Sequence, residues 1–290
     1  MNLALFVSGD LGFNVLEYLR DSKYSINCVF TDLNSRGIVD TANHNRWPIF
    51  TGNPRNERAL RFIDAYEIDI ILSINYLFLI ERSLFSKSKL AVNIHGSLLP
   101  KYRGRTPHVW AIINNESKTG VTAHLIDDGC DAGDIIKQKE VIIDNNDTGA
   151  DILEKFNKLY IPFVDEILDD YERGSITLLP QNNKNATFFG KRTPDDGRIN
   201  WGWQKERIRN WVRAQAYPYP GAFTYSDELG EKVIIDEVVF SDKGFNETDR
   251  NGLIVSLNPI CVKTPNGVLE LRNIRNLQSL LILKVGQKLV

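Results

Sequence analysis

The segment AVNIHGSLLPKYRGRTPHVWAI (Ala91–Ile112) holds the densest group of side chains that could do chemistry. Asn93 and His95 lie two positions apart on a predicted strand, so the period of two directs both side chains to one face. They stand at the carboxyl end of that strand, where open α/β sheets place ligands. Histidine acts as a general acid or base near neutral pH, and an asparagine amide can donate to a developing oxyanion. The alternative is that His95 is a structural histidine at the end of a strand.

A second segment, HLIDDGCDAGDII (His124–Ile136), contains four aspartates. The Ala-Gly pair inside it lets the backbone pass close to another group. A polar hairpin loop is the alternative explanation for the first two aspartates. A divalent cation could also bind this cluster, but histidines at a matching spacing are missing from the loop. The four candidates are Asp127, Asp128, Asp131 and Asp134.

The segment SGDLG (Ser8–Gly12) is a predicted strand-to-helix turn. Backbone amides at a helix N-terminus favour phosphate groups, which makes Ser8 and Gly9 candidates for contact with an anionic substrate. The turn does not have the pattern GxGxxG, and no acidic residue is predicted to follow a second strand in the dinucleotide-binding manner. Dinucleotide binding is therefore not predicted.

The elements that must position these residues follow from the apolar pattern. Short, continuous apolar runs alternate with amphipathic helical segments at residues 13–21 and 58–66. Such alternation implies a parallel sheet that is buried on both faces. We therefore predict an open α/β domain over residues 1–185. Its first strands are expected at Leu3–Ser8, Ile26–Phe30, Trp47–Phe50, Ile68–Ile74 and Leu90–His95.

The rest of the chain predicts a second, smaller domain. Two further strands, Gly120–Asp127 and Ile135–Ile143, precede a long helix over Asp151–Gly174, which is either continuous or kinked near Pro162. A polar, turn-rich linker is expected at residues 186–200. A helix over 204–216 and four short strand segments then indicate a small β-barrel domain at residues 201–290.

Composition narrows the class of protein. The chain has 290 residues, of which 42% are hydrophobic and 25% charged, as is typical of globular proteins. With 35 basic and 37 acidic residues, the balance argues against a large nucleic-acid surface. No apolar run approaches the ~20 residues that span a bilayer, and the N-terminus does not read as a signal peptide. Three widely spaced cysteines without a CxxC pair predict neither zinc nor a disulfide framework, and therefore a cytoplasmic protein.

Two motifs of the sequence, taken together, resemble those of a known enzyme family. NIHGSLLPKYRGRTP followed by GVTAHLIDDGCDAGDII resembles the formyltransferases that use N10-formyltetrahydrofolate. The family pattern is Asn-x-His-x-Ser-Leu-Leu-Pro, then an aromatic-Arg-Gly, then an Asp before x-Gly. The resemblance continues through FFGKRTPDDGRINW and PYPGAF into the C-terminal domain. The matching residues are Asn93, His95, Ser97, Leu98, Leu99, Pro100, Tyr102, Arg103, Gly104 and Asp131.

The resemblance implies a Rossmann-like catalytic domain followed by an OB-like barrel, and formyl transfer from the folate to a primary amine. It implies that Asn93 and His95 stabilise the tetrahedral oxyanion, while Asp131 orients His95 and helps to pass protons. It implies no metal. The folate site would be lined by Tyr76, Leu77, Phe78, Leu79, Ile80, Asp127 and Asp128, with core packing as the alternative for Leu77 and Leu79. Substrate contacts would come from Ser8, Gly9, Tyr76, Arg103, Arg105, Lys191 and Arg192.

Within the family, the strings GKRTPDDG and PYPGAF resemble enzymes that formylate nucleotide-linked amino sugars. The expected acceptor is a dTDP-4-amino-4,6-dideoxyglucose for O-antigen or surface-glycan synthesis, because no dehydrogenase half follows the barrel in this sequence. Alternatives are UDP-4-amino-4-deoxyarabinose and methionyl-tRNA. A non-enzymatic nucleotide-binding module is a further alternative, because fold alone does not determine function. A homodimer is expected as the commonest oligomer.

Overall fold

The computed structural model of the chain describes residues 1–226, 230, 232–275 and 283–290. The chain divides into two compact units. Two segments that precede residue 155 belong to the same unit as the C-terminal part. Unit 1 comprises residues 1–104, 119–141 and 155–189, and unit 2 comprises residues 105–118, 142–154 and 190–290.

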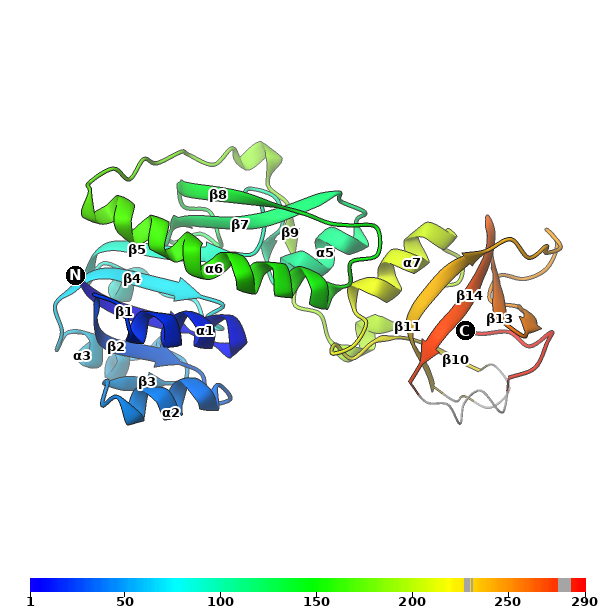
Figure 1. Cartoon of the computed structure of the whole chain (residues 1–290), viewed down its shortest axis with the longest axis horizontal. Coiled ribbons are helices and arrows are strands. Elements are labelled where there is room, and N and C mark those ends of the chain that lie inside the picture. Colours follow the sequence, from blue (N-terminus) through cyan, green and yellow to red (C-terminus); the bar gives the residue numbers. More distant parts are fainter. Residues whose placement is uncertain (227–229, 231, 276–282) are drawn as a thin grey trace. The chain divides into compact units, whose positions relative to one another are not determined.

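A seven-stranded sheet forms the centre of unit 1, with the strand order β3-β2-β1-β4-β5-β7-β8 (Figure 1). The strands from β3 through β5 are parallel, as the continuous apolar runs predict. The order reverses direction between β1 and β4, and ligands of such sheets bind outside the carboxyl ends of the strands at this point. The strands are β1 (Asn2–Val7), β2 (Ser25–Thr31), β3 (Ile49–Thr51), β4 (Ile68–Ile74), β5 (Ser88–His95), β7 (Lys118–Leu125) and β8 (Ile135–Ile142).

The sheet is mixed rather than wholly parallel, because β7 pairs with β5 in the antiparallel direction. The segment that joins the two strands therefore starts and finishes at the same end of the strands, beside the carboxyl end of β5. In this pairing Asn93 is opposite His124, and His95 is opposite Thr122. A separate short parallel pair is formed by β6 (Arg103–Gly104) and β9 (Phe188–Phe189).

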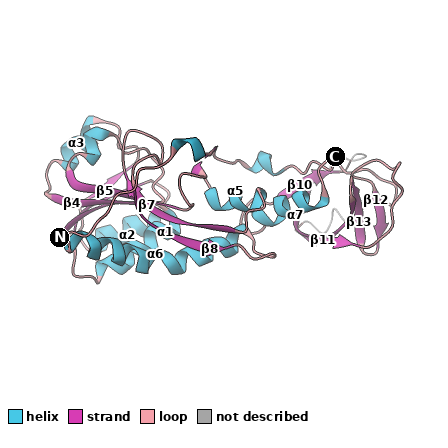
Figure 2. Ribbon diagram, turned by 90° about the horizontal axis from the view of Figure 1, so that it is seen from above, coloured by secondary structure: helices cyan, strands magenta, loops and turns pink. Residues whose placement is uncertain are grey.

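Helices cover both faces of the sheet in unit 1, with α1 and α6 on one face and α3 on the other (Figures 1 and 2). The long helix α6 is continuous and contains Pro162, which decides between the two alternatives left by the sequence. The sequence did not predict α2, which buries only Ile38 and Ala42. In the part of the chain that the structure describes, no helix combines the length and apolar composition needed to cross a membrane. The helices are α1 (Gly9–Arg20), α2 (Arg36–His44), α3 (Glu57–Ile63), α4 (Arg82–Phe85) and α6 (Gly149–Glu172).

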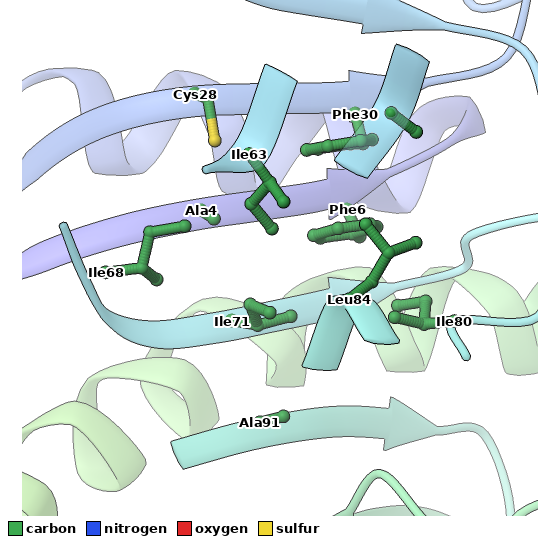
Figure 3. Packing of buried hydrophobic residues seen from close by; sticks show 11 residues of the cluster. Ala4, Phe6, Cys28, Phe30, Ile63, Ile68, Ile71, Ile80, Leu84 and Ala91 are labelled. Atoms are coloured by element: carbon green, nitrogen blue, oxygen red, sulfur yellow. The ribbon is translucent and has the colours of Figure 1, made fainter. Parts of the chain in front are cut away.

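A tightly packed apolar cluster fixes the inner strands and the helices on one face of the sheet (Figure 3). Phe6 of β1 and Phe30 of β2 stack with ring centroids 4.2 Å apart. Ile63 of α3 and Leu84 of α4 pack against the same face. Because cores are packed as densely as organic crystals, this cluster holds the carboxyl ends of the strands in a fixed arrangement.

Unit 2 contains a five-stranded antiparallel sheet with the order β10-β11-β14-β13-β12. Residues close to the C-terminus bond to both of its edge strands: the Val290 amide donates to Tyr225, and the Gly286 amide donates to Ile254. The sheet is thereby closed in the manner of the predicted small barrel. The elements are α5 (Pro107–Ile113), α7 (Lys205–Ala214), β10 (Ala222–Tyr225), β11 (Lys232–Ser241), β12 (Ile254–Leu257), β13 (Ile260–Thr264) and β14 (Gly267–Ile274).

Candidate active site

Four polar side chains meet beside the carboxyl end of β5 in unit 1. The antiparallel pairing of β5 with β7 brings Asn93 opposite His124, and 3.0 Å separates Asn93 Nδ2 from His124 Nε2. The same ring nitrogen lies 3.7 Å from Asp131 Oδ1. Asp131 Oδ2 in turn lies 3.7 Å from His95 Nδ1. The three residues expected to be catalytic are thus brought together, with His124 as a fourth member.

His95 is buried, and its ring orientation is set by the backbone. Its Nε2 lies 2.8 Å from the carbonyl oxygen of Tyr102. A carbonyl only accepts, so Nε2 carries a proton and donates it. The other nitrogen, Nδ1, therefore faces the Asp131 carboxylate and is the atom of His95 that can gain or lose a proton during a reaction.

Asp131 is held from both its side chain and its backbone. The Gly104 amide donates to Asp131 Oδ2 at 2.8 Å, and the residue itself has a left-handed φ of 50°. Burial raises the pKa of the Asp131 carboxyl, but the nearby His95 and His124 and the Gly104 amide lower it by more, so that the pKa lies below its ordinary value. The carboxylate is therefore ionised at neutral pH.

Gly104 allows this contact because only glycine fits its position. Its φ is 103°, a region that side chains rarely adopt. A Cβ at this position would lie 2.3 Å from the carbonyl oxygen of Phe189. The short β6–β9 pair thus brings the Gly104 amide to the carboxylate of Asp131.

Gln181 fixes the backbone of the aspartate loop. Its Nε2 donates to the carbonyl oxygens of Asp131 at 2.9 Å and of Gly133 at 2.7 Å. Its Oε1 accepts from the Arg103 guanidinium at 2.6 Å, and Arg103 also donates to Asn183 at 2.9 Å. Arg103, expected to contact substrate, is only 3% exposed and joins the Tyr-Arg-Gly motif to the loop of Asp131 instead of presenting its charge to solvent.

Sequence reasoning missed His124 and Gln181 as members of this site. His124 had one available signal: like Asn93 and His95, it lies in a short strand that ends at a polar loop. Its register against Asn93 required the direction of β7, which the sequence did not give. Gln181 lies 50 residues from Asp131 in a segment without regular apolar periodicity, so it carried no sequence signal.

The segment expected to line the folate site alternates between core and solvent. Ile80 belongs to the apolar cluster, and Tyr76 packs edge-on against Phe6 with centroids 5.3 Å apart. Leu77 and Leu79 are instead 38% and 60% exposed. Core packing, the alternative explanation for these two leucines, is therefore wrong. Exposed apolar side chains that follow the carboxyl end of β4 suit an apolar ligand.

The first two aspartates of the acidic loop have local partners. Asp127 accepts from the Gly129 amide at 3.0 Å, which forms a turn. Asp128 is exposed and pairs with the guanidinium of Arg82, with 3.1 Å between Arg82 Nε and Asp128 Oδ2. This pair joins α4 to the loop that carries Asp131.

At the turn that begins α1, the backbone amide of Gly9 is already hydrogen-bonded within the protein. The Gly9 amide donates to Ser35 Oγ at 2.9 Å, and Ser35 donates to Asp32 Oδ2 at 2.6 Å. Ser8 is buried. An acidic residue, Asp32, directly follows β2. Its carboxylate, however, accepts from Ser35 and from the Asn34 amide.

The remaining expected substrate cations belong to unit 2. Arg105 and Lys191 are exposed. Arg192 is half-buried, with its guanidinium carbon 4.3 Å from the ring centre of Trp211 and 5.1 Å from that of Trp110. It also donates to Gln215 Oε1 at 3.0 Å. Arg192 therefore forms part of the packing of unit 2.

Two family models match consecutive parts of the sequence. The model for formyl transferases matches residues 19–161, and the model for the formyl transferase C-terminal domain matches residues 191–279. Together they span most of the chain, and the first includes Asn93, His95 and Asp131. The chain belongs to the formyltransferase family.

Solved structures with the same fold cover between 81% and 95% of the formyltransferase chain. WlaRD, a sugar 3N-formyl transferase solved with dTDP and 5-N-formyl-THF, is 23% identical, with a TM-score of 0.68 over 95% of this chain and 98% of that one. A 4-N formyltransferase from Francisella tularensis is 22% identical, with a TM-score of 0.69 over 81% and 96%. The methionyl-tRNA formyltransferase from Clostridium thermocellum is 18% identical, with a TM-score of 0.61 over 94% and 99%. These likenesses establish the fold but not the acceptor.

The geometry of this formyltransferase suits acyl transfer at the end of β5. An amide donor, an imidazole with one reactive nitrogen and an ionised carboxylate lie within one cluster. Such a set can stabilise an oxyanion and move a proton. Among the residues that the structure describes, no three His, Cys, Asp or Glu side chains are arranged to hold a metal ion.

Proposed function

We propose that this formyltransferase moves a formyl group from N10-formyltetrahydrofolate to the amine of a nucleotide-linked amino sugar. The observation that carries the proposal is the cluster of Asn93, His95, His124 and Asp131 at the end of β5. A cluster of this kind is suited to a tetrahedral intermediate, because it combines an oxyanion donor with a proton-transfer pair.

The reaction begins when the neutral amine of the sugar attacks the formyl carbon. A carbon–nitrogen bond forms, and the formyl oxygen becomes an oxyanion that accepts a hydrogen bond from Asn93 Nδ2 and, once His95 Nδ1 has taken the proton that the amine loses, from Nδ1–H as well. Asp131 stabilises the imidazolium of His95, 3.7 Å away. The bond from the carbon to folate N10 then breaks. The proton lost by the amine equals the proton gained by N10, and Asp131 and His95 pass it between them.

Leu77 and Leu79 support a site for the formyl donor. Both are exposed apolar side chains on the segment that follows β4, the strand next to β5. The faces of a pterin ring can pack on such side chains, while its nitrogen- and oxygen-rich edge needs hydrogen bonds. Tyr76, from the same segment, is partly buried and packs against Phe6 with ring centroids 5.3 Å apart.

For the acceptor we propose dTDP-4-amino-4,6-dideoxyglucose, with UDP-4-amino-4-deoxyarabinose as the second choice. Its amine is a free nucleophile after loss of one proton, as the attack on the formyl carbon requires. Methionyl-tRNA is less favoured because residues 201–290 carry 12 basic and 10 acidic residues, which does not make a phosphate-backbone surface. The product would serve O-antigen or surface-glycan synthesis, and we expect the enzyme to be a homodimer.

The test is an acceptor panel with limiting N10-formyltetrahydrofolate and mass-spectrometric detection of products. The panel contains both nucleotide sugars at equal concentration and methionyl-tRNA in a parallel reaction. We expect formylated dTDP sugar to dominate, and Asn93→Ala to slow its formation by about two to three orders of magnitude. Dominant formylation of methionyl-tRNA would overturn the choice of a sugar, and dominant formylated UDP-arabinose would reverse the order of the two sugars.

A further inference from the structure

We propose that His124 is a positioning residue that fixes the orientation of the Asn93 amide, so that an N–H and not the carbonyl oxygen faces the formyl group. The inference rests on the proposed role of Asn93 as oxyanion donor. The three residues expected to be catalytic do not explain how the Asn93 amide is oriented. The inference assigns this task to His124 on β7. The observations are two hydrogen bonds made by the two nitrogens of one imidazole ring.

The first hydrogen bond joins the two strands. Asn93 Nδ2 lies 3.0 Å from His124 Nε2. An amide nitrogen only donates, so His124 Nε2 must accept and carries no proton. One of the two amide hydrogens of Asn93 is thereby committed to the ring, and the other is left for a ligand.

The second hydrogen bond independently selects the same tautomer. His124 Nδ1 lies 2.8 Å from the carbonyl oxygen of Leu125. The carbonyl only accepts, so Nδ1 carries the proton. A neutral imidazole has one donor and one acceptor nitrogen, and these two contacts use both in the only compatible way. The backbone of β7 thus fixes the tautomer of the His124 ring, and the ring fixes the orientation of the Asn93 amide.

The surroundings of His124 keep the ring neutral. The side chain is only 4% exposed. Burial lowers the pKa of His124 from 6.5 to about 4, and His95 and Arg103 lower it too, while Asp131 and the Leu125 carbonyl act in the opposite direction. At neutral pH the ring is therefore uncharged, which leaves Nε2 available as an acceptor.

An amide that is rotated by half a turn is excluded by this arrangement. It would bring Asn93 Oδ1 against the unprotonated Nε2 of His124, and two acceptors would face each other. The hydrogen bond would be lost, and a carbonyl oxygen would face the developing oxyanion. Because oxyanion stabilisation depends on donors that are already oriented before the reaction, the effect of His124 is expected in kcat rather than in KM.

A matched pair of variants tests this role. His124→Leu and His124→Gln both lose the donor to Leu125, but the ε oxygen of glutamine can still accept from Asn93. We expect His124→Leu to lower kcat roughly 10- to 100-fold with KM within about twofold, and His124→Gln to restore most of that loss. Equal losses in the two variants would overturn the proposal.

A double variant separates this inference from the proposed function. In an Asn93→Ala background, His124→Leu should cause no further loss of kcat, because the group that it orients is gone. An active Asn93→Ala enzyme would instead refute the role of Asn93 on which the inference rests. An inactive Asn93→Ala enzyme together with a fully active His124→Leu enzyme would refute the inference alone.

A measurement on the unmodified enzyme reads the tautomer of His124 directly. With ¹⁵N-labelled histidine, the two ring nitrogens of a neutral imidazole give separate protonated and unprotonated signals. We expect His124 to show a protonated Nδ1 and an unprotonated Nε2 at pH 7, with assignment by loss of the signals in His124→Gln. A protonated Nε2 would overturn the proposal.

Discussion

The Arg103 guanidinium and the Gln181 side-chain carbonyl lie 2.6 Å apart, and through this contact a buried cation supports the loop that carries Asp131. The amide of the same glutamine donates to the backbone carbonyl of Asp131 at 2.9 Å. A side chain 50 residues from the aspartate thus determines where its carboxylate stands.

We expect Gln181→Leu to lower kcat about 10-fold, because a loop displaced by a fraction of an ångström misplaces the carboxylate. Steady-state kinetics with the formyl donor and the acceptor will measure this effect. Asn183→Ala is the matched control, since it removes the other acceptor of Arg103 without touching the loop. A Gln181→Leu enzyme as active as this control would contradict the assignment.

His95→Ala and Asp131→Ala are each expected to remove most turnover, by about two to three orders of magnitude, while the fold is retained. Both residues act on one intermediate, so the double variant should lose little more than the single ones. Single-turnover rates and circular dichroism of all three variants provide the check. Near-normal turnover in either single variant is incompatible with these roles.

Leu79→Asp is expected to raise the KM for the formyl donor about 10-fold, because a charge replaces an exposed apolar contact with the ligand. The thermal midpoint should change little, since Leu79 is 60% exposed in the free protein. Leu178→Asp, at another exposed leucine of unit 1, is the control. An unchanged KM in Leu79→Asp would remove this leucine from the donor site.

Arg192→Ala is expected to destabilise unit 2 by about 1–3 kcal/mol, because it removes a cation between two indole rings and leaves the Gln215 carbonyl without this donor. Urea unfolding followed by tryptophan fluorescence will report this directly. The exposed neighbour Lys191 provides the comparison, and Lys191→Ala should change stability by less than about 0.5 kcal/mol. Equal stability of the two variants would exclude a packing role for Arg192.

The stability of the protein should fall as the pH decreases from about 7 towards 4. In unit 2, His108 lies 2.8 Å from the Tyr219 hydroxyl, and burial lowers its pKa from 6.5 to about 4. The unfolded chain therefore binds a proton at a higher pH than the folded chain does. Protonation of His108 favours unfolding across this window by on the order of 3 kcal/mol, and His124 of unit 1, whose pKa burial also lowers to about 4, acts in the same direction.

Thermal midpoints of the wild type and of His108→Gln at pH 7 and pH 5 will test this linkage. Glutamine can still bond to Tyr219 but does not titrate, so the difference between the two midpoints should shrink. His44→Gln, at an exposed histidine of α2, is the control. An unchanged difference in His108→Gln would show that another group is responsible.

The sequence by itself determined the class of fold and pointed to Asn93, His95 and Asp131 as the candidate catalytic residues. Continuous apolar runs need burial on both faces, so β1, β2, β4 and β5 were predictable from local pattern alone. The two-residue spacing of Asn93 and His95 placed both on one face of a strand end, because side chains alternate along a strand. Asp131 followed from the family motif.

The tertiary structure decided everything that depends on pairing between distant segments. His124 faces Asn93 only because β7 runs antiparallel to β5 in one register. The local sequence pattern predicts neither the direction of β7 nor its register. The sequence predicted that Arg103 contacts substrate, but the side chain is buried, and the carbonyl of Gln181 makes its burial tolerable. Core packing was the alternative explanation for Leu77 and Leu79 in the sequence. In the structure both side chains are exposed, whereas Ile80 beside them is buried. Burial is a property of the packed chain, and residue type alone does not determine it.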